Sequence, residues 1–107
     1  MKEKVIKVKE ENQNKLYSIN HALKLCYKID KALLSNYDKI IIDFTDIKLL
    51  TLIFFEFSLG YYINKFGEEE FNNKFKIIGL NESGLDLYNN VYNNCIKKNG
   101  KSHEKEK

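Results

Sequence analysis

The sequence contains no proline, no tryptophan and no arginine, and its apolar runs are short. All 18 basic residues are therefore lysines, whereas nucleic-acid-binding domains usually present a basic face in which arginine is prominent. The apolar stretch 49–55 ends at Glu56, far short of the roughly 20 residues that span a bilayer. The charged N-terminus is unlike a secretion signal. These absences argue against a nucleic acid or a membrane as the partner.

Charge and cysteine content predict a small domain in a reduced compartment. Residues 1–96 contain 13 lysines and 13 acidic residues, and residues 97–107 contain five lysines and two acidic residues, which accounts for the net charge of +3. We expect one domain over residues 1–98 and a disordered lysine-rich tail over 99–107. Cys26 and Cys95 have no CxxC spacing, which favours buried thiols in a cytoplasmic protein over a disulfide between them.

The clearest structural signal is the run Ile40-Ile41-Ile42, which predicts a strand over Lys39–Phe44 that is buried on both faces. A nearly continuous apolar segment, Leu52–Phe66, predicts one long helix that begins at an N-cap, Thr51, and ends at Gly67. The remaining patterns predict an edge strand at Lys4–Lys9, a polar connection at Asn12–Tyr17, a helix from Ser18 to about Ser35, a short helical turn at Glu68–Phe71, a strand at Lys74–Leu80 and a helix over roughly Glu82–Lys98. The apolar face of the first helix is expected to comprise Ile19, Ala22, Leu23, Cys26, Ile29 and Leu33.

The order β-α-β-α-β-α indicates the α/β class, with α+β as the alternative. We expect a single small domain with a mixed or mainly parallel sheet of three or four strands and helices packed on it. In open α/β sheets, functional groups collect at the carboxyl ends of the strands. The turn 45–51 follows the central strand and is therefore the first candidate site.

No catalytic or metal site emerges from the residue types. His21 and His103 lack companions at ligand spacing, and the five glycines are scattered away from any phosphate-binding loop. We therefore expect no metal and no cofactor. Asp43 could act with Glu56 in a small-ligand-binding or enzymatic cleft. The simpler interpretation is that Asp43 accepts hydrogen bonds from nearby backbone.

The motif Ile-Ile-Ile-Asp-Phe-Thr-Asp-Ile resembles the STAS-like domain of the sulfate-transporter and anti-sigma-factor-antagonist superfamily. It is followed by Leu50-Thr51, by a helix containing Phe54, Glu56 and Gly60, and by Phe66-Gly67 before the third strand. The small bacterial branch of STAS-like proteins has the most similar pattern. This resemblance implies a small sheet with helices on one side and a role in protein–protein switching. It also implies a partner that is a histidine-kinase-like ATPase or an anti-sigma-type regulator.

The chain departs from the superfamily at the phosphorylated turn. Thr51, Leu52, Ile53 and Phe54 occupy the positions of the Asp-Ser-Ser-Gly motif, so both serines are absent, and Phe57 replaces the second residue of the acidic pair. We therefore predict a non-enzymatic regulatory or adaptor domain that binds its protein partner without the phosphoserine switch. The predicted contact residues lie in the turn and at the start of the following helix: Thr45, Asp46, Leu50, Thr51, Leu52, Ile53, Phe55 and Glu56.

Three alternatives stay open. Thr51 could replace the missing serine as the phosphoacceptor, although a plain helix cap is its simpler role. The domain could be a ligand-binding or enzymatic unit that uses Asp43 and Glu56. It could also be a structural homodimer that pairs through the second helix or through the edge strand Lys4–Lys9.

Overall fold

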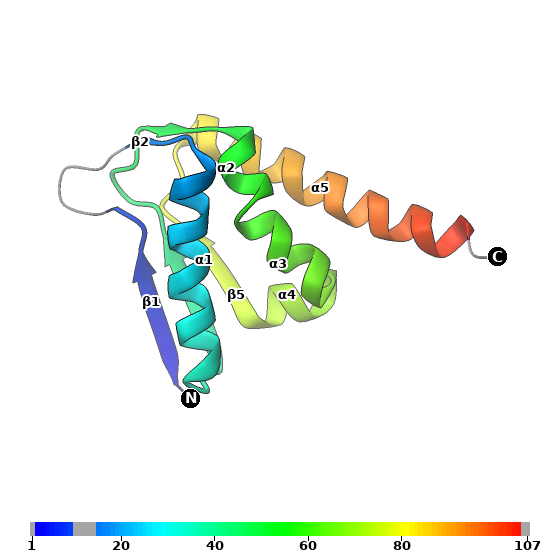
Figure 1. The fold of residues 1–107 in the computed structure, drawn as a ribbon, viewed down its shortest axis with the longest axis horizontal. Coiled ribbons are helices and arrows are strands. Elements are labelled where there is room, and N and C mark those ends of the chain that lie inside the picture. The colour runs from blue at the N-terminus through cyan, green and yellow to red at the C-terminus, as the bar shows by residue number, and fades with distance from the viewer. Residues whose placement is uncertain (1, 10–14, 106–107) are drawn as a thin grey trace.

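The computed structural model describes residues 2–9 and 15–105, with side chains through residue 98. Its centre is a parallel sheet of three strands in the order β1-β3-β5 (Figure 1). The strands are β1 (Glu3–Lys7), β3 (Lys39–Asp43) and β5 (Phe75–Ile78). Val5 pairs with Ile41, and Ile41 pairs with Lys76. The α/β class and the parallel sheet are confirmed.

The helices cover one face of this sheet. The chain crosses the sheet in one direction, from β1 through β3 to β5, and crossovers of one hand that move in one direction place their helices on the same side. Accordingly, Ile6, Ile40 and Ile42 are buried on the helix-covered face, whereas Val5 and Ile78 are exposed on the other. Ile41 also lies on the open face and is only partly buried. The prediction of a strand buried on both faces is wrong for this reason.

A second, two-stranded parallel ladder joins β2 (Lys15–Leu16) to β4 (Leu49–Leu50). Each short strand comes just before a helix cap: β2 is followed by Tyr17 and the cap Ser18 of α1 (Ile19–Leu34), and β4 by the cap Thr51 of α2 (Leu52–Glu56). The ladder therefore holds the N-termini of α1 and α2 side by side. Of the polar connection expected at Asn12–Tyr17, residues 12–14 lie outside the described residues, and Lys15–Leu16 is this strand.

The long helix expected over Leu52–Phe66 is interrupted, and the structure has α2 and α3 (Leu59–Phe66) in its place. The break lies at Ser58, whose hydroxyl donates to the carbonyl of Phe54 at 2.7 Å and whose amide donates to the carbonyl of Phe55 at 3.3 Å. A serine that bonds back to the preceding turn competes with the regular helical pattern and bends the chain. Sequence periodicity did not reveal this bend because Ser58 is fully buried among apolar residues.

The remaining helices complete the core. Glu68–Lys74 forms α4, and α5 runs from Glu82 to Lys105. The sequence predicts that this helix ends near Lys98, whereas α5 continues to Lys105. No proline interrupts the stretch after Lys98, and a single glycine costs a helix only about 1 kcal/mol. Residues 106–107, at the end of the predicted tail, lie outside the described residues. Val91 and Cys95 of α5 pack against Gly60 of α3, where a Cβ would lie 3.2 Å from Val91 Cγ1.

The structure confirms the predicted caps of α1 and α2. It also confirms a positive φ at Gly67, 84°. The predicted apolar face of α1 is only half right. Its buried stripe consists of Ala22, Leu25, Ile29 and Ala32, whereas Ile19 and Leu23 are exposed. Both cysteines are free, Cys95 buried and Cys26 partly buried. Among the described residues, no helix is long and apolar enough to cross a bilayer.

Candidate partner-binding surface

The turn after β3 is an ordered and uncovered structure. Asp43 Oδ1 accepts hydrogen bonds from the backbone amide and from the hydroxyl of Thr45, at 2.9 and 2.6 Å. These bonds, together with the positive charge of Lys7, hold the pKa of Asp43 below its usual range. Thr45 and Asp46 are exposed, and Asp46 has a φ of 68°, which aspartate tolerates better than most residues. The turn is therefore accessible to a partner.

Gly79 makes this turn sterically feasible. It follows β5, has a φ of 81°, and faces the Asp43–Thr45 bonds from the neighbouring strand. A Cβ at this position would lie 2.6 Å from the amide nitrogen of Thr45 and 2.8 Å from Asp43 Oδ1. Only a residue without a side chain fits there.

Thr51 connects the start of α2 to the start of α1. Its Oγ1 accepts from the amide of Phe54 at 3.2 Å and donates to the carbonyl of Tyr17 at 3.0 Å. The hydroxyl is thus a helix cap and a link between helices at the same time. A phosphoryl group on this oxygen would remove the bond that it donates to Tyr17.

The structure divides the eight predicted contact residues into two groups. The exposed or partly exposed residues are Thr45, Asp46, Thr51, Leu52, Ile53 and Glu56. Leu50 and Phe55 are buried, because Leu50 belongs to β4 and the Phe55 ring packs against Phe44, Phe54 and Tyr88. These two positions are corrected to core residues, and only the other six can contact a partner directly.

Helix α1 contributes contact residues that the sequence analysis missed. Ile19, Leu23 and Tyr27 follow each other at intervals of four residues and are exposed along one flank of α1. Tyr17, just before the helix, is exposed as well. The missed signal was that α1 carries more apolar residues than one buried stripe requires.

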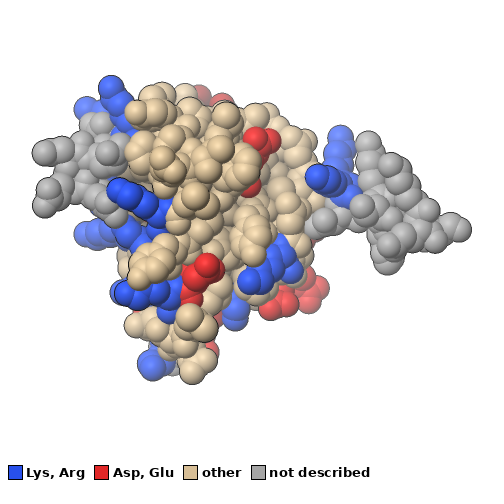
Figure 2. Space-filling view, viewed as in Figure 1, with Lys and Arg blue, Asp and Glu red and all other residues tan. Residues whose placement is uncertain are grey.

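Exposed apolar side chains of α1 and α2, together with Tyr17 before α1, Phe57 after α2 and Tyr61 on α3, form one surface, which we call the α1–α2 surface. Its members are 44–65% exposed and are Tyr17, Ile19, Leu23, Tyr27, Ile53, Phe57 and Tyr61. The helices meet where the thiol of Cys26 donates to the carbonyl of Phe57 at 3.3 Å. Figure 2 shows this side of the molecule, with mostly uncharged side chains over α1 and α2 and lysines toward the left margin. An apolar surface of this kind is characteristic of interaction sites.

A buried tyrosine joins α3 to α1. The hydroxyl of Tyr62, on α3, donates to Asp30 Oδ1 at 2.6 Å and lies 3.1 Å from the carbonyl of Cys26. Both acceptors belong to α1. Burial, and next the hydrogen bond to Asp30, raise the pKa of Tyr62 well above its usual value. Burial likewise raises the pKa of the Cys26 thiol, so this thiol is a poor nucleophile.

The candidate catalytic carboxylates are not brought together by any contact in the described part of the chain. Asp43 is engaged by Thr45 at the end of β3, whereas Glu56 is exposed at the end of α2. A carboxylate whose pKa is lowered is a weak general base. Within residues 2–9 and 15–105, no group of three or more His, Cys, Asp or Glu could hold a metal ion. His21 instead completes the cap of α1, where its Nδ1 lies 3.3 Å from the amide of Ser18.

Comparison with known families agrees with the fold described above. Residues 21–85 match the family described as a STAS-like domain of unknown function (DUF4325). Since this match covers more than half of the 107 residues, the chain belongs to this STAS-like family. No curated protein and no solved structure matches the chain significantly.

Proposed function

We propose that the domain is a non-enzymatic regulatory or adaptor module that binds a partner protein through the α1–α2 surface and the adjacent turn 45–51. The observation that carries this proposal is the exposure of seven large apolar side chains on α1, α2, α3 and the residues beside them. Thr51 joins α2 to α1, and Tyr62 joins α3 to α1. Aromatic residues are enriched at the centres of protein interfaces, and four of the seven are tyrosine or phenylalanine.

The proposed partner is a histidine-kinase-like ATPase or an anti-sigma-type regulator. The resemblance of the sequence to anti-sigma-factor antagonists supports this class of partner. The charge at the border of the surface supports a partner whose apolar contacts are flanked by acidic residues, since Lys24 and Lys31 are exposed on α1 beside Leu23 and Tyr27. Complementary charges of this kind mainly increase the rate and the specificity of association.

Capture from a lysate of the source organism tests the proposal when it is followed by reconstitution. The wild-type chain, Ile53→Asp and Leu23→Asp are immobilised, and the captured proteins are identified by mass spectrometry. Leu85→Asp is the matched control, because Leu85 is equally exposed but lies on α5 outside the surface. We expect an ATPase or anti-sigma-type protein that binds the wild type and the control but neither surface variant.

Calorimetry with the purified partner then confirms direct binding. Light scattering after size exclusion examines the homodimer alternative. A dimer of the wild type that Ile53→Asp abolishes would contradict the proposal and would assign the surface to self-association. Binding that Ile53→Asp and Leu85→Asp leave equally intact would place the partner site elsewhere.

A further inference from the structure

Strand β1 is one edge of the sheet, and a defined set of its backbone groups faces outward. The carbonyl of Lys2 accepts from the amides of Asp38 and Lys39, and the amide of Val8 donates to the carbonyl of Asp43. The backbone amides and carbonyls of the even-numbered residues of β1 therefore face β3. Because successive residues of a strand alternate in direction, the amides and carbonyls of the odd-numbered residues between them point to the open edge. Among the described residues, no hydrogen bond occupies these outward groups.

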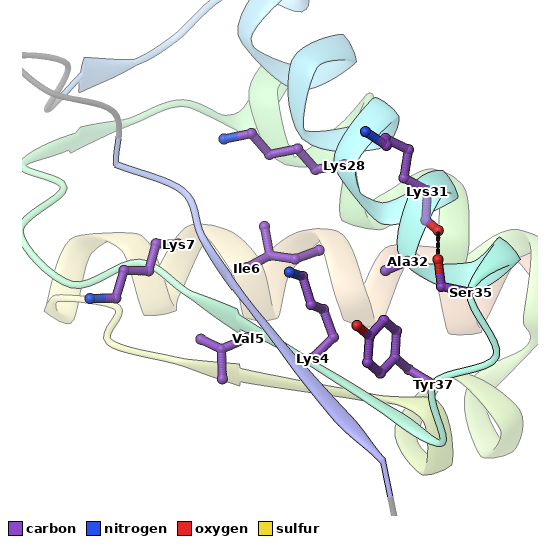
Figure 3. Close-up of a pocket in the computed structure, with 9 residues that line it drawn as sticks. All are labelled: Lys4, Val5, Ile6, Lys7, Lys28, Lys31, Ala32, Ser35 and Tyr37. Atoms are coloured by element: carbon purple, nitrogen blue, oxygen red, sulfur yellow. Dashed lines mark hydrogen bonds between the residues drawn. The ribbon is translucent and has the colours of Figure 1, made fainter.

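A cavity of about 350 Å³ lies between this edge and α1 (Figure 3). We call it the edge groove. Ile6 and Ala32 are its buried apolar residues, and Ser35 and Tyr37 contribute hydroxyl groups at one end. Four lysines also line it: Lys4, Lys7, Lys28 and Lys31. None of the lining residues carries a carboxylate.

The carboxylates nearest in sequence to the groove bond other groups or lie on the opposite face of the sheet. Asp30, beside Lys31, accepts from the hydroxyl of Tyr62 at 2.6 Å. Asp38 Oδ2 accepts from the backbone amide of Lys2 at 2.9 Å. Glu3 pairs with Lys39 in the register of the sheet, and its side chain belongs to the open face, opposite the side chain of Lys4. Lys7 lies close enough to Asp43 to lower the pKa of that carboxyl, and the ammonium of Lys31 lies 5.5 Å from the centre of the Tyr27 ring. Lys4 on β1 and Lys31 on α1 line the groove from its two sides, and the proposal is tested on these two lysines.

We propose that the edge groove binds an extended acidic segment of a partner protein as an additional strand beside β1. The outward amides and carbonyls of Glu3, Val5 and Lys7 would hydrogen-bond its backbone, as in other complexes formed by strand addition. Its side chains would alternate, so that every second one points toward α1. Glutamate or aspartate at those positions would meet the ammonium groups of Lys4 and Lys31.

The same charges disfavour a second copy of the chain as the occupant. Pairing of β1 with another β1 would bring Lys4 and Lys7 of each copy close to lysines of the other, and like charges on neighbouring strands are destabilising. Lysine on an edge strand commonly prevents such self-association. The groove shares Lys31 with the border of the α1–α2 surface, but its apolar residues, Ile6 and Ala32, do not belong to that surface.

Fluorescence anisotropy of the full chain with a labelled peptide tests this proposal. The probe is acetyl-Glu-Thr-Glu-Val-Glu-Thr-Glu-amide, in which the glutamates share one side of an extended chain. The first control replaces every glutamate by lysine. The second control keeps the sequence of the probe but carries N-methyl groups on every other backbone amide. It is made in two versions, one methylated at the odd positions and one at the even positions, so that one of the two lacks the N–H groups that would face β1. We expect binding of the probe, no binding of the lysine peptide, and at least about tenfold weaker binding of one N-methylated version.

Protein variants separate charge from backbone pairing. The double variant Lys4→Glu/Lys31→Glu is expected to weaken binding by at least about tenfold. Its matched control, Lys48→Glu/Lys65→Glu, makes the same change in net charge on exposed residues outside the groove. Val5→Pro removes one outward amide without breaking the ladder to β3, and Val5→Thr retains that amide. Circular dichroism verifies the fold of each variant. If Val5→Pro does not fold, the N-methylated peptides alone test whether the probe pairs with the backbone of β1.

Two results would overturn the proposal. Equal binding of the probe and of both N-methylated versions would reduce the interaction to electrostatic adhesion without an added strand. No binding of the probe at millimolar concentration would mean that the lysines only protect the edge. Chemical-shift changes at the amides of Val5 and Lys7 on addition of the probe would support strand addition directly.

Discussion

The hydroxyl of Thr51 donates a hydrogen bond to the carbonyl of Tyr17 at 3.0 Å. This bond joins the residue that caps α2 to the residue that precedes the cap of α1. The two helices therefore begin at one point, and the exposed apolar side chains that follow each cap lie on a common surface. The position of α2 relative to α1 depends on this contact, and the bond of Tyr62 to Asp30 fixes α3, the next helix, against α1.

Replacement of Thr51 should weaken this junction. Thr51→Ala removes the cap of α2 and the bond to Tyr17, and we expect a loss of about 1–2 kcal/mol in the free energy of unfolding. Thr51→Ser keeps the hydroxyl and should lose much less. Urea denaturation followed by circular dichroism measures both values. Equal stability of the alanine and serine variants would show that the hydroxyl does not contribute.

The same residue permits a test of the phosphorylation alternative. If Thr51 is a phosphoacceptor, incubation of the chain with lysate and ATP adds one phosphoryl group to the intact mass, and Thr51→Ala abolishes the addition. Because Oγ1 is already used by Phe54 and Tyr17, we expect no such addition to the folded protein. A phosphoryl group mapped to Thr51 by fragmentation would contradict this expectation.

Two glycines with positive φ should differ in their tolerance of alanine. Gly67 has a φ of 84° and no atom within 4 Å of an added Cβ, so Gly67→Ala should cost only the backbone strain, about 1–3 kcal/mol. Gly79→Ala adds a steric clash with the backbone of Thr45 to a similar strain. We expect it to be clearly more destabilising, or to prevent folding. Denaturation of both variants under identical conditions gives the comparison, which would fail if the two costs were equal.

Stability should fall at alkaline pH because of Tyr62. Its pKa is raised by burial and by Asp30 in the folded state, whereas the unfolded chain ionises near pH 10. The stabilisation of the folded state by the protonated Tyr62 hydroxyl is therefore complete below about pH 10 and decreases as the pH rises above this value. Tyr62→Phe should lose about 1–2 kcal/mol at neutral pH and should show a shallower decrease at high pH. Tyr61→Phe, at an exposed position of the same helix, is the control for both measurements.

Stability should also fall at acidic pH because of Asp43. Its hydrogen bonds with Thr45 lower its pKa in the folded state, so its contribution is present above the unfolded value of about 3.9 and is lost as the pH falls through the folded value. Asp43→Asn should therefore reduce the pH dependence of the melting temperature below about pH 4. Asp46→Asn alters a neighbouring exposed carboxylate and serves as the control. Identical profiles for the wild type and Asp43→Asn would contradict this assignment.

Much of the fold was predictable because its signals are local. The β-branched run Ile40–Ile42 indicates a strand, and Ser18 and Thr51 stand where helix caps are expected. The break at Ser58 was not predictable from periodicity, since it depends on a hydrogen bond inside an otherwise apolar segment. The buried stripe of α1 was also ambiguous, because Leu23 and Leu25 satisfy helical spacing equally well and only the position of the sheet distinguishes them.

By itself, the sequence determined the α/β class, the helix caps and the STAS-like resemblance, because propensity, capping and apolar period act over a few neighbouring residues. Only the tertiary structure decided which apolar residues reach the surface. It buries Phe55 and Leu50 and leaves Ile53, Leu23 and Tyr27 exposed, and it exposes one edge and one face of the sheet. Exposure depends on which segments, distant in the chain, pack against each other, and no local pattern contains that information.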